Sequence, residues 1–283
     1  MTDDDGTGPG DRNGADPRPG GGDDEEPTIL LTNDDGIGSP GFRATFEALT
    51  SVGEVTAVAP ARDQSAVGRA ITIGGSVTVE EHALGYALAG TPADCVVAGL
   101  EALVPDADLV VSGCNKGANL GAYVLGRSGT VSAAVEAAFF DVPAIAVSLY
   151  VEAGDEEFHE LETEPEDYAG AARAAAYLAE HAPDAGVFDR ADYLNVNAPV
   201  PDGNPLKMEI TEPSLVYDME AVHRDREVHL RDRIWERMAT GDVPDPDGTD
   251  RRAVVDGNVS VSPLTAPHTT ERHDALDALA ETF

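Results

Sequence analysis

Short apolar runs alternate with helix-patterned stretches over residues 27–199, and this alternation constrains the fold more than any other feature of the chain. Each run has the length of a buried strand, and the stretches between runs carry apolar residues at helical spacing. Chains with this rhythm form a largely parallel sheet with helices on both faces. We therefore predict an α/β fold for residues 27–199, which we interpret as the catalytic core.

The predicted fold is Rossmann-like and doubly wound, so its ligands should bind at the carboxyl ends of the strands. Thr91 before Pro92 predicts a helix start, because Thr caps helices and Pro favours their first position. Gly74 and Gly75 between the runs 71–73 and 77–79 predict a β-hairpin. The predicted strands are 28–32, 55–59, 86–89, 108–112, 144–149 and 193–196, and the predicted helices are 42–52, 92–103, 130–140 and 168–181.

The two ends of the chain differ in composition from the core. Residues 1–26 are Gly, Pro, Asp and Glu with almost no apolar side chains, which predicts a disordered acidic tail. Residues 200–283 are interpreted as a β-rich C-terminal extension that packs with the core and serves oligomerisation. Within it we expect β segments at 206–232 and 250–264, a loop at 241–250 and a closing helix near 272–280.

The net charge of −35, from 53 acidic and 18 basic residues, limits the partners of this chain. Such a surface repels nucleic acid and anionic membranes. The acidity is spread over the folded part, which favours adaptation to high salt, where screening weakens self-repulsion, over an acidic interaction protein. The N-terminus lacks the features of a signal peptide and no apolar run reaches membrane-spanning length, so we expect a cytoplasmic protein.

Cys95 and Cys114 are the only cysteines, and both lie in apolar surroundings. Two cysteines do not make a zinc set, and a structural disulfide is not expected in a cytosolic chain. We predict that both are buried, free side chains.

Three polar segments each follow a predicted strand. They contain Asp34 with Asp35, Ser65, and Asn115. Since the carboxyl ends of parallel strands meet at one edge, these side chains should converge. Two adjacent carboxylates repel each other unless a cation holds them, and oxygen ligands suit Mg²⁺ or Mn²⁺ rather than Zn²⁺. We predict one divalent ion per subunit.

A fourth segment, Gly126-Arg127-Ser128-Gly129-Thr130, opens the predicted helix 130–140. N–H groups at a helix start attract anions, and Arg127 can pair with a phosphate there. A hard metal beside an oxyanion site implies phosphoryl hydrolysis. The residues predicted to contact phosphate are Asn119, Ser128, Gly129 and Thr130.

Simpler interpretations of these segments remain open. The acidic pair and Ser128 can be helix caps, Ser65 an ordinary surface residue, and the two asparagines turn formers. The pattern Gly36-x-Gly38-x-x-Gly41 matches a dinucleotide fingerprint, but acids would face the pyrophosphate and the second strand does not end in an acid. Other open classes are a polyphosphatase or acid-type phosphatase, a covalent aspartyl-phosphate phosphatase and a Mg²⁺-binding receiver-type domain.

The chain closely resembles the SurE family of stationary-phase survival nucleotidases from about residue 28 to its C-terminus. The resemblance lies in long motifs in the family's order: ILLTNDDGIGSPG (29–41), VTAVAPARDQSAVGRAIT (55–72), GTPADCVVAGL (90–100), VSGCNKGANLGAYVLGRSGTVSAAVEAAFF (111–140), VPAIAVSL (142–149) and LNVNAP (194–199). Cys114, Arg127, Gly68-Arg69 and the stretch 218–240 depart from the family's usual pattern.

This resemblance implies a metal-dependent phosphatase acting on nucleoside 5′- and 3′-monophosphates. It implies Asp34, Asp35, Ser65 and Asn115 as metal ligands. It further implies a homodimer or homotetramer whose subunits exchange C-terminal elements. We assign catalysis to Asp34 and Asp35, with Asp35 the first choice to take a proton from the attacking water.

Overall fold

The computed structural model describes residues 26–152, 161–266, 268 and 279–280. The predicted acidic tail lies almost entirely outside these residues, as does most of the helix predicted near 272–280. The described strands are β1 (Thr28–Thr32), β2 (Glu54–Pro60), β3 (Val79–His82), β4 (Gly85–Leu88), β5 (Leu109–Lys116), β6 (Ala144–Tyr150), β7 (Tyr193–Pro199), β8 (Met208–Ile210), β9 (Met219–Arg224), β10 (Glu227–Asp232) and β11 (Val259–Leu264).

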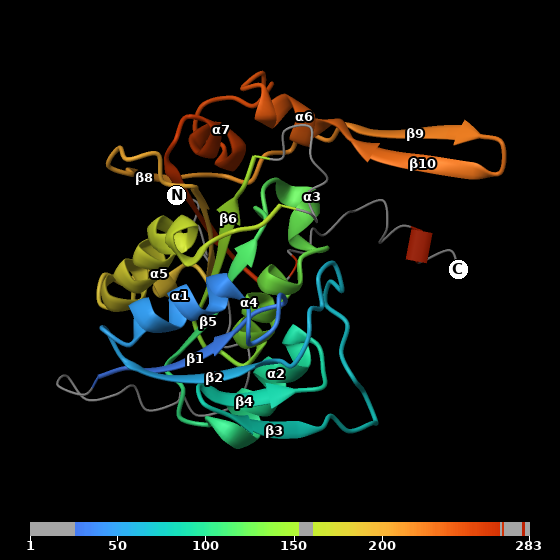
Figure 1. Ribbon diagram of the computed structural model, residues 1–283. Coiled ribbons are helices and arrows are strands. Elements are labelled where there is room, and N and C mark those ends of the chain that lie inside the picture. The colour runs from blue at the N-terminus through green and yellow to red at the C-terminus, as the bar shows by residue number, and fades with distance from the viewer. Residues whose placement is uncertain (1–25, 153–160, 267, 269–278, 281–283) are drawn as a thin grey trace, which may run out of the picture.

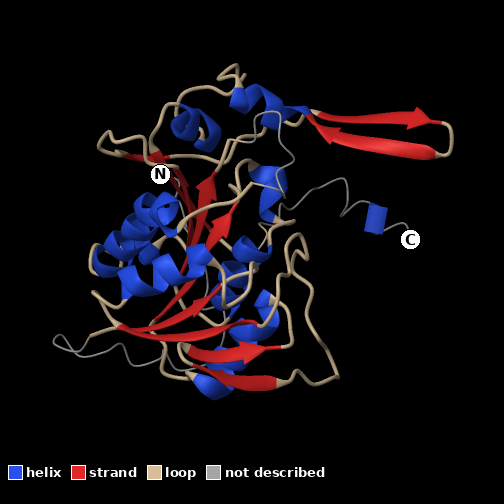
Figure 2. Cartoon of the chain, viewed as in Figure 1, coloured by secondary structure: helices blue, strands red, loops and turns tan. Residues whose placement is uncertain are grey.

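Helices flank the strands on both sides (Figures 1 and 2). They are α1 (Pro40–Leu49), α2 (Pro92–Ala98) with the π-helix Gly99–Leu103, α3 (Ala122–Leu125), α4 (Gly129–Phe139), the 3₁₀ helices Pro165–Tyr168 and Val187–Asp189, α5 (Ala169–His181), α6 (Arg233–Ala239) and α7 (Asp250–Val255). Within the described residues, no helix combines the length and the apolar character that a bilayer span requires.

Nine strands form one sheet in the order β3-β4-β2-β1-β5-β6-β7-β11-β8. Pairing from β4 to β7 is parallel throughout, while β3 and β11 run antiparallel to their neighbours β4 and β7. The predicted mostly parallel, doubly wound α/β fold is therefore confirmed. The six strands predicted at 28–32, 55–59, 86–89, 108–112, 144–149 and 193–196 all occur, with shifts at their ends.

The side chains of β1 alternate between two hydrophobic clusters on opposite faces of the sheet. Ile29 and Leu31 belong to the cluster that α1 and α5 cover, whereas Leu30 belongs to the cluster under α2 and α4. Successive side chains of a strand point to opposite faces, so a continuous apolar run is what a strand buried on both faces requires. Both cysteines are free and buried, one in each cluster, as predicted.

The hairpin predicted around Gly74 and Gly75 is wrong. The antiparallel pair lies later, where β3 pairs with β4 and Val79 faces Leu88. Residues 71–78 are instead tied to the start of α2. Asp94 accepts hydrogen bonds from the Thr72 N–H (2.7 Å) and hydroxyl (2.9 Å), so these polar groups are satisfied without a ladder.

Helix α2 starts as its sequence predicts. Thr91 caps it, Pro92 occupies the first turn, and Thr91 and Asp94 form a reciprocal capping box. The β segment predicted for 250–264 is only half right, because α7 precedes β11 there. Valines at 254 and 255 suggested a strand, but Thr249 and Asp250 place a cap and an acid at a helix start.

The C-terminal segment contributes strands to the central sheet. β11 pairs with β7, and β8 pairs with β11, so both extend the sheet that holds the site. The β9–β10 hairpin forms a separate two-stranded sheet and projects away from the body of the protein in Figure 1.

Candidate metal and phosphate site

A cavity of about 330 Å³ lies at the carboxyl ends of β1, β2 and β5. The strand order reverses at β1, since β2 lies on one side of it and β5 on the other, and ligands of open α/β sheets bind at such switch points. Six of the eight predicted site residues line this cavity: Asp34, Asp35, Ser65, Asn115, Asn119 and Ser128.

Asp34 is almost completely buried at the end of β1. Its Oδ1 accepts the Thr130 hydroxyl at 2.5 Å, and its backbone carbonyl accepts the Gln64 N–H at 2.7 Å. A Cβ on Gly129 would stand 2.8 Å from Asp34 Oδ2, so only glycine leaves room for the carboxylate. The chain thus fixes one oxygen of Asp34 and packs the start of α4 directly against it.

Asp35 is held from the opposite side. Its Oδ2 accepts the Lys116 N–H at 2.8 Å, which links the end of β1 to the end of β5. Burial and then the charge of Asp34 raise the pKa of Asp35 to about 7. Burial also raises the pKa of Asp34. Both carboxyl groups therefore resist ionisation in the absence of a cation.

Ser65 reaches the cavity from the loop after β2. Its N–H and its hydroxyl donate to Asp63 Oδ1, at 2.7 and 2.5 Å. Asp63 also lines the cavity and was not predicted as a site residue. An acid two positions before a serine in a loop is the signature of an Asx turn, and this signal could have identified it.

Asn115 lies where β5 departs from a regular register with β6. Ser112 pairs with Ala146 and Asn115 with Ser148, so one extra residue of β5 lies between these pairs. Bulges re-aim side chains next to sites. The Asn115 amide donates to the Gly117 carbonyl at 2.5 Å, which leaves its Oδ1 as the available oxygen.

Asn119 is fixed by contacts on all sides. Its N–H donates to Asn197 Oδ1 at 2.7 Å, its carbonyl accepts from Asn195 at 2.9 Å, and its side-chain amide donates to Ser148 at 2.8 Å. These partners come from β6 and β7, so the turn after β5 is anchored to two neighbouring strands. One N–H of the amide remains for a ligand.

Three residues at the start of α4, Ser128, Gly129 and Thr130, were predicted to contact phosphate, and they differ in whether they line the cavity. Ser128 lines the cavity and also caps the helix, since its hydroxyl accepts the Val131 N–H at 3.1 Å. Gly129 and Thr130 do not line the cavity. Thr130 is fully buried and its hydroxyl is committed to Asp34, so this side chain supports a carboxylate instead of facing a ligand.

Arg127 and Lys116 bring positive charge to the cavity wall. The Arg127 guanidinium lies over Tyr123, with Cζ 5.1 Å from the ring centroid, and 6.0 Å from the ring of Tyr217. Lys116 Nζ donates to the Leu161 carbonyl. A stacked guanidinium keeps its edge available for bidentate contact with an anion.

The donor chemistry fits a hard divalent cation. Asp34, Asp35, Ser65 and Asn115 offer oxygen atoms to one cavity, where burial raises the pKa of both carboxyl groups and the charge of Asp34 raises that of Asp35 further. Mg²⁺ and Mn²⁺ prefer such ligands and would relieve this repulsion.

Comparison with known proteins gives the family of this chain. Residues 29–218 match the family model described as survival protein SurE. The chain belongs to the SurE family. A protein of Haloarcula marismortui named 5′-nucleotidase SurE is 67% identical over 92% of this chain and 96% of its own length. One of the same name from Haloquadratum walsbyi is 63% identical, over 92% and 98%.

A solved SurE structure resembles this one in fold. The crystal structure of the SurE protein from Aquifex aeolicus superposes with a TM-score of 0.74 at 30% identity, covering 90% of this chain and 99% of that one. The SurE relatives from two haloarchaea agree with the halophilic adaptation that the acidic composition predicts.

Proposed function

We propose that this chain is a metal-dependent phosphomonoesterase that hydrolyses nucleoside 5′-monophosphates, and 3′-monophosphates as well, to nucleoside and phosphate. The observation that carries the proposal is that the pair Asp34–Asp35 shares one cavity with Asn115, Asn119 and Arg127. The names of the curated relatives give the reaction class.

The proposed metal ligands are Asp34, Asp35, Ser65 and Asn115, and one Mg²⁺ or Mn²⁺ would bind per subunit. When bound, such an ion lowers the pKa of water and offsets the charge of a phosphate. Thr130 and the Lys116 N–H keep the two carboxylates in place by fixing one oxygen of each.

The other residues of the cavity act on the substrate. Asn119, Ser128 and the guanidinium of Arg127 would hold phosphate oxygens. Gly129 and Thr130 do not line the cavity and support Asp34 instead. Asp35 Oδ1, the oxygen that does not bind the Lys116 N–H, is the atom assigned to accept a proton from the attacking water. Asp34 is the alternative acceptor.

The assembly and location of the protein are part of this proposal. A homodimer or homotetramer is proposed from the family resemblance, and a cytoplasmic location from the sequence. Light scattering of the full chain in molar KCl tests the assembly.

The activity test is a hydrolysis panel in molar KCl. It contains 5′- and 3′-nucleoside monophosphates and short polyphosphates, each with Mg²⁺, with Mn²⁺ and with EDTA. We expect phosphate release from monophosphates, abolished by EDTA and restored by metal. Faster release from polyphosphate would support the polyphosphatase alternative, and metal-independent release from every substrate would refute the proposal.

A further inference from the structure

An arginine lies fully buried on α7, outside the cavity. The guanidinium of Arg251 donates to the Val216 carbonyl at 3.0 Å, to the Ser214 hydroxyl at 3.1 Å and to the Leu120 carbonyl at 3.5 Å. It also pairs with buried Asp245 at 3.3 Å. One side chain therefore bonds the turn after β5 and the segment after β8 at the same time.

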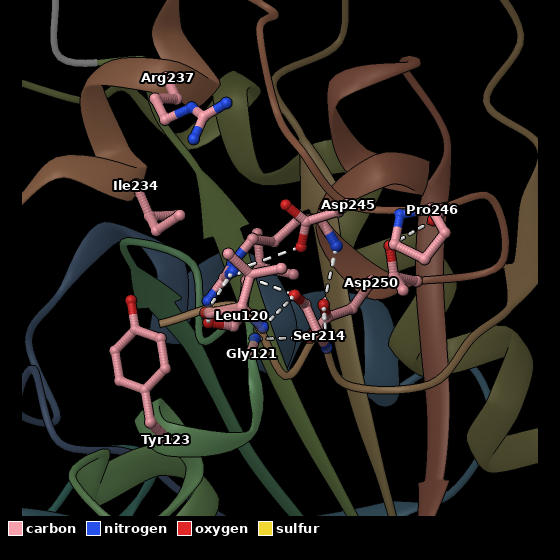
Figure 3. A network of polar contacts seen from close by, with 12 residues as sticks. Leu120, Gly121, Tyr123, Ser214, Ile234, Arg237, Asp245, Pro246 and Asp250 are labelled. Carbon is pink, nitrogen blue, oxygen red and sulfur yellow. Dashed lines mark hydrogen bonds and ion pairs between the residues drawn. The ribbon is translucent and has the colours of Figure 1, made fainter. Parts of the chain in front are cut away.

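The neighbouring residue on α7 contacts the same two segments. The carboxylate of Asp250 accepts the Gly121 N–H at 2.6 Å and the Ser214 N–H at 2.9 Å, as the dashed lines in Figure 3 show. The Ala122 N–H donates to the Ser214 carbonyl at 2.9 Å and completes the contact. Carboxylate and guanidinium thus satisfy donors and acceptors of both segments.

The fit around the turn is tight. Gly121 has φ +87°, and a Cβ there would lie 2.1 Å from the Arg251 guanidinium nitrogen Nη2. The chain therefore reaches this point in a conformation that only glycine adopts readily, directly against the buried cation. Gly121 lies two residues after Asn119, which lines the cavity.

Arg251 also lies near the aromatic ring over which Arg127 of the cavity wall is stacked. Tyr123 has two guanidinium groups near its ring, Arg251 at 5.3 Å and Arg127 at 5.1 Å from the centroid. The Tyr123 hydroxyl donates to Asp232, and Tyr217 meets its ring edge-on at 5.0 Å. The position of Arg127 thus depends on a tyrosine that Arg251 helps to hold.

We infer that Arg251, with Asp250, is a positioning residue for the anion-binding wall of the cavity, residues 119–127. It acts through Leu120, Gly121 and Tyr123, and does not touch the substrate. The inference rests on the proposed function for the identity of the anion, a nucleotide phosphate. It predicts that disturbing α7 weakens phosphate binding more than it slows the reaction.

The test compares Arg251→Lys with Arg252→Lys in the full chain, in molar KCl with Mn²⁺. Lysine keeps the charge of Arg251 but lacks the planar fork that reaches four acceptors at once. Arg252 is the matched control, because it follows on the same helix and pairs with Asp256 at 3.2 Å. The measurements are KM and kcat for a 5′-monophosphate and the inhibition constant of inorganic phosphate.

We expect Arg251→Lys to raise KM and the phosphate inhibition constant about 10-fold, as the loss of one hydrogen bond to a charged group does, while kcat changes less than about threefold. The control should match the wild type. A lower kcat or melting temperature with unchanged KM and inhibition constant would mean a purely structural role and overturn the inference.

Hydrogen exchange of the metal-free protein gives a readout that does not require activity. We expect faster exchange in residues 117–128 of Arg251→Lys, with β6 and β7 unchanged. Unaltered exchange in 117–128 would contradict the inference. Should the wild type hydrolyse no nucleotide, the proposed function fails, and this comparison still decides whether Arg251 orders the wall. Arg251→Met provides the same comparison without the charge.

Discussion

Two pairs of acids in the described part of the chain differ in what neutralises them. Asp245 and Asp250 surround Arg251, and backbone N–H groups complete the hydrogen bonds of Asp250. Asp34 and Asp35 stand next to each other at a cavity, where each has one oxygen bound by the chain. The first pair has its cation, Arg251, within the fold, whereas the second is arranged for a cation from outside.

Neutralising one cavity carboxylate should reveal the largest difference between the two pairs of acids. Asp34→Asn or Asp35→Asn should lower kcat/KM at least about 100-fold, since loss of even an outer-shell partner of a metal costs 10–100-fold. The control is Asp106→Asn, an equal charge change at an exposed position. Full metal-dependent turnover in both cavity variants would disprove the assigned role, and melting curves check that the fold is intact.

Removing the buried cation Arg251 should affect mainly the stability of the protein. Arg251→Met leaves Asp245 buried without its partner, and breaking a buried pair costs about 3–5 kcal/mol. Denaturant unfolding in molar KCl measures this cost. In the presence of EDTA, Asp34→Asn should not destabilise the protein, because it removes a charge that the metal-free fold does not neutralise. Equal losses in both variants would remove the distinction between the two pairs.

A smaller effect should follow when the support of a cavity carboxylate is removed. Thr130→Val deletes the hydroxyl that donates to Asp34 Oδ1 and keeps the shape of the side chain. We expect the Mn²⁺ concentration for half-maximal activity to rise about 10-fold, at the lower end of outer-shell effects. Ser132→Ala is the control, because Ser132 lies two residues further along α4 and donates to the Ser128 carbonyl. Equal Mn²⁺ requirements in the wild type and Thr130→Val would show that Asp34 needs no such support.

The two pairs of acids also differ in how much of their surroundings could be predicted from the sequence. Asp34 and Ser65 follow strands of a parallel sheet and Asn115 lies at the end of β5, so strand ends alone place them at one edge. Thr130 was predicted to face phosphate, yet its hydroxyl binds Asp34, 96 residues earlier in the chain. Helix-start chemistry identifies such a residue as polar but does not say which way its side chain points.

Arg251 was beyond prediction for a related reason. Its contact with Leu120 spans 131 positions, and a basic residue in the pattern DRRAVV is usually an exposed one. The predicted β segment over 250–264 also concealed the helix that carries it. Local patterns fix elements and strand ends, whereas the partners of a buried charge depend on how distant segments meet.

The smallest predicted effect uses pH to separate the two pairs. The folded, metal-free protein keeps the Asp35 proton up to a pH of about 7, because burial and Asp34 raise its pKa, whereas the unfolded chain releases it near the ordinary value of 3.8. Between these values the folded state binds more protons, so this group's contribution to stability falls as pH rises. Asp35→Asn lacks the effect.

With EDTA, the melting temperature of the wild type should therefore fall relative to Asp35→Asn between pH 4 and about 7.5, because the folded state holds the Asp35 proton over this range and the unfolded chain does not. The raised pKa of Asp250 cancels, since both proteins contain it. With saturating Mn²⁺ the wild type should gain stability as pH rises, because the metal competes with the proton. Parallel curves in EDTA would mean that the cavity carboxylates are already neutralised within the chain, as Asp245 and Asp250 are.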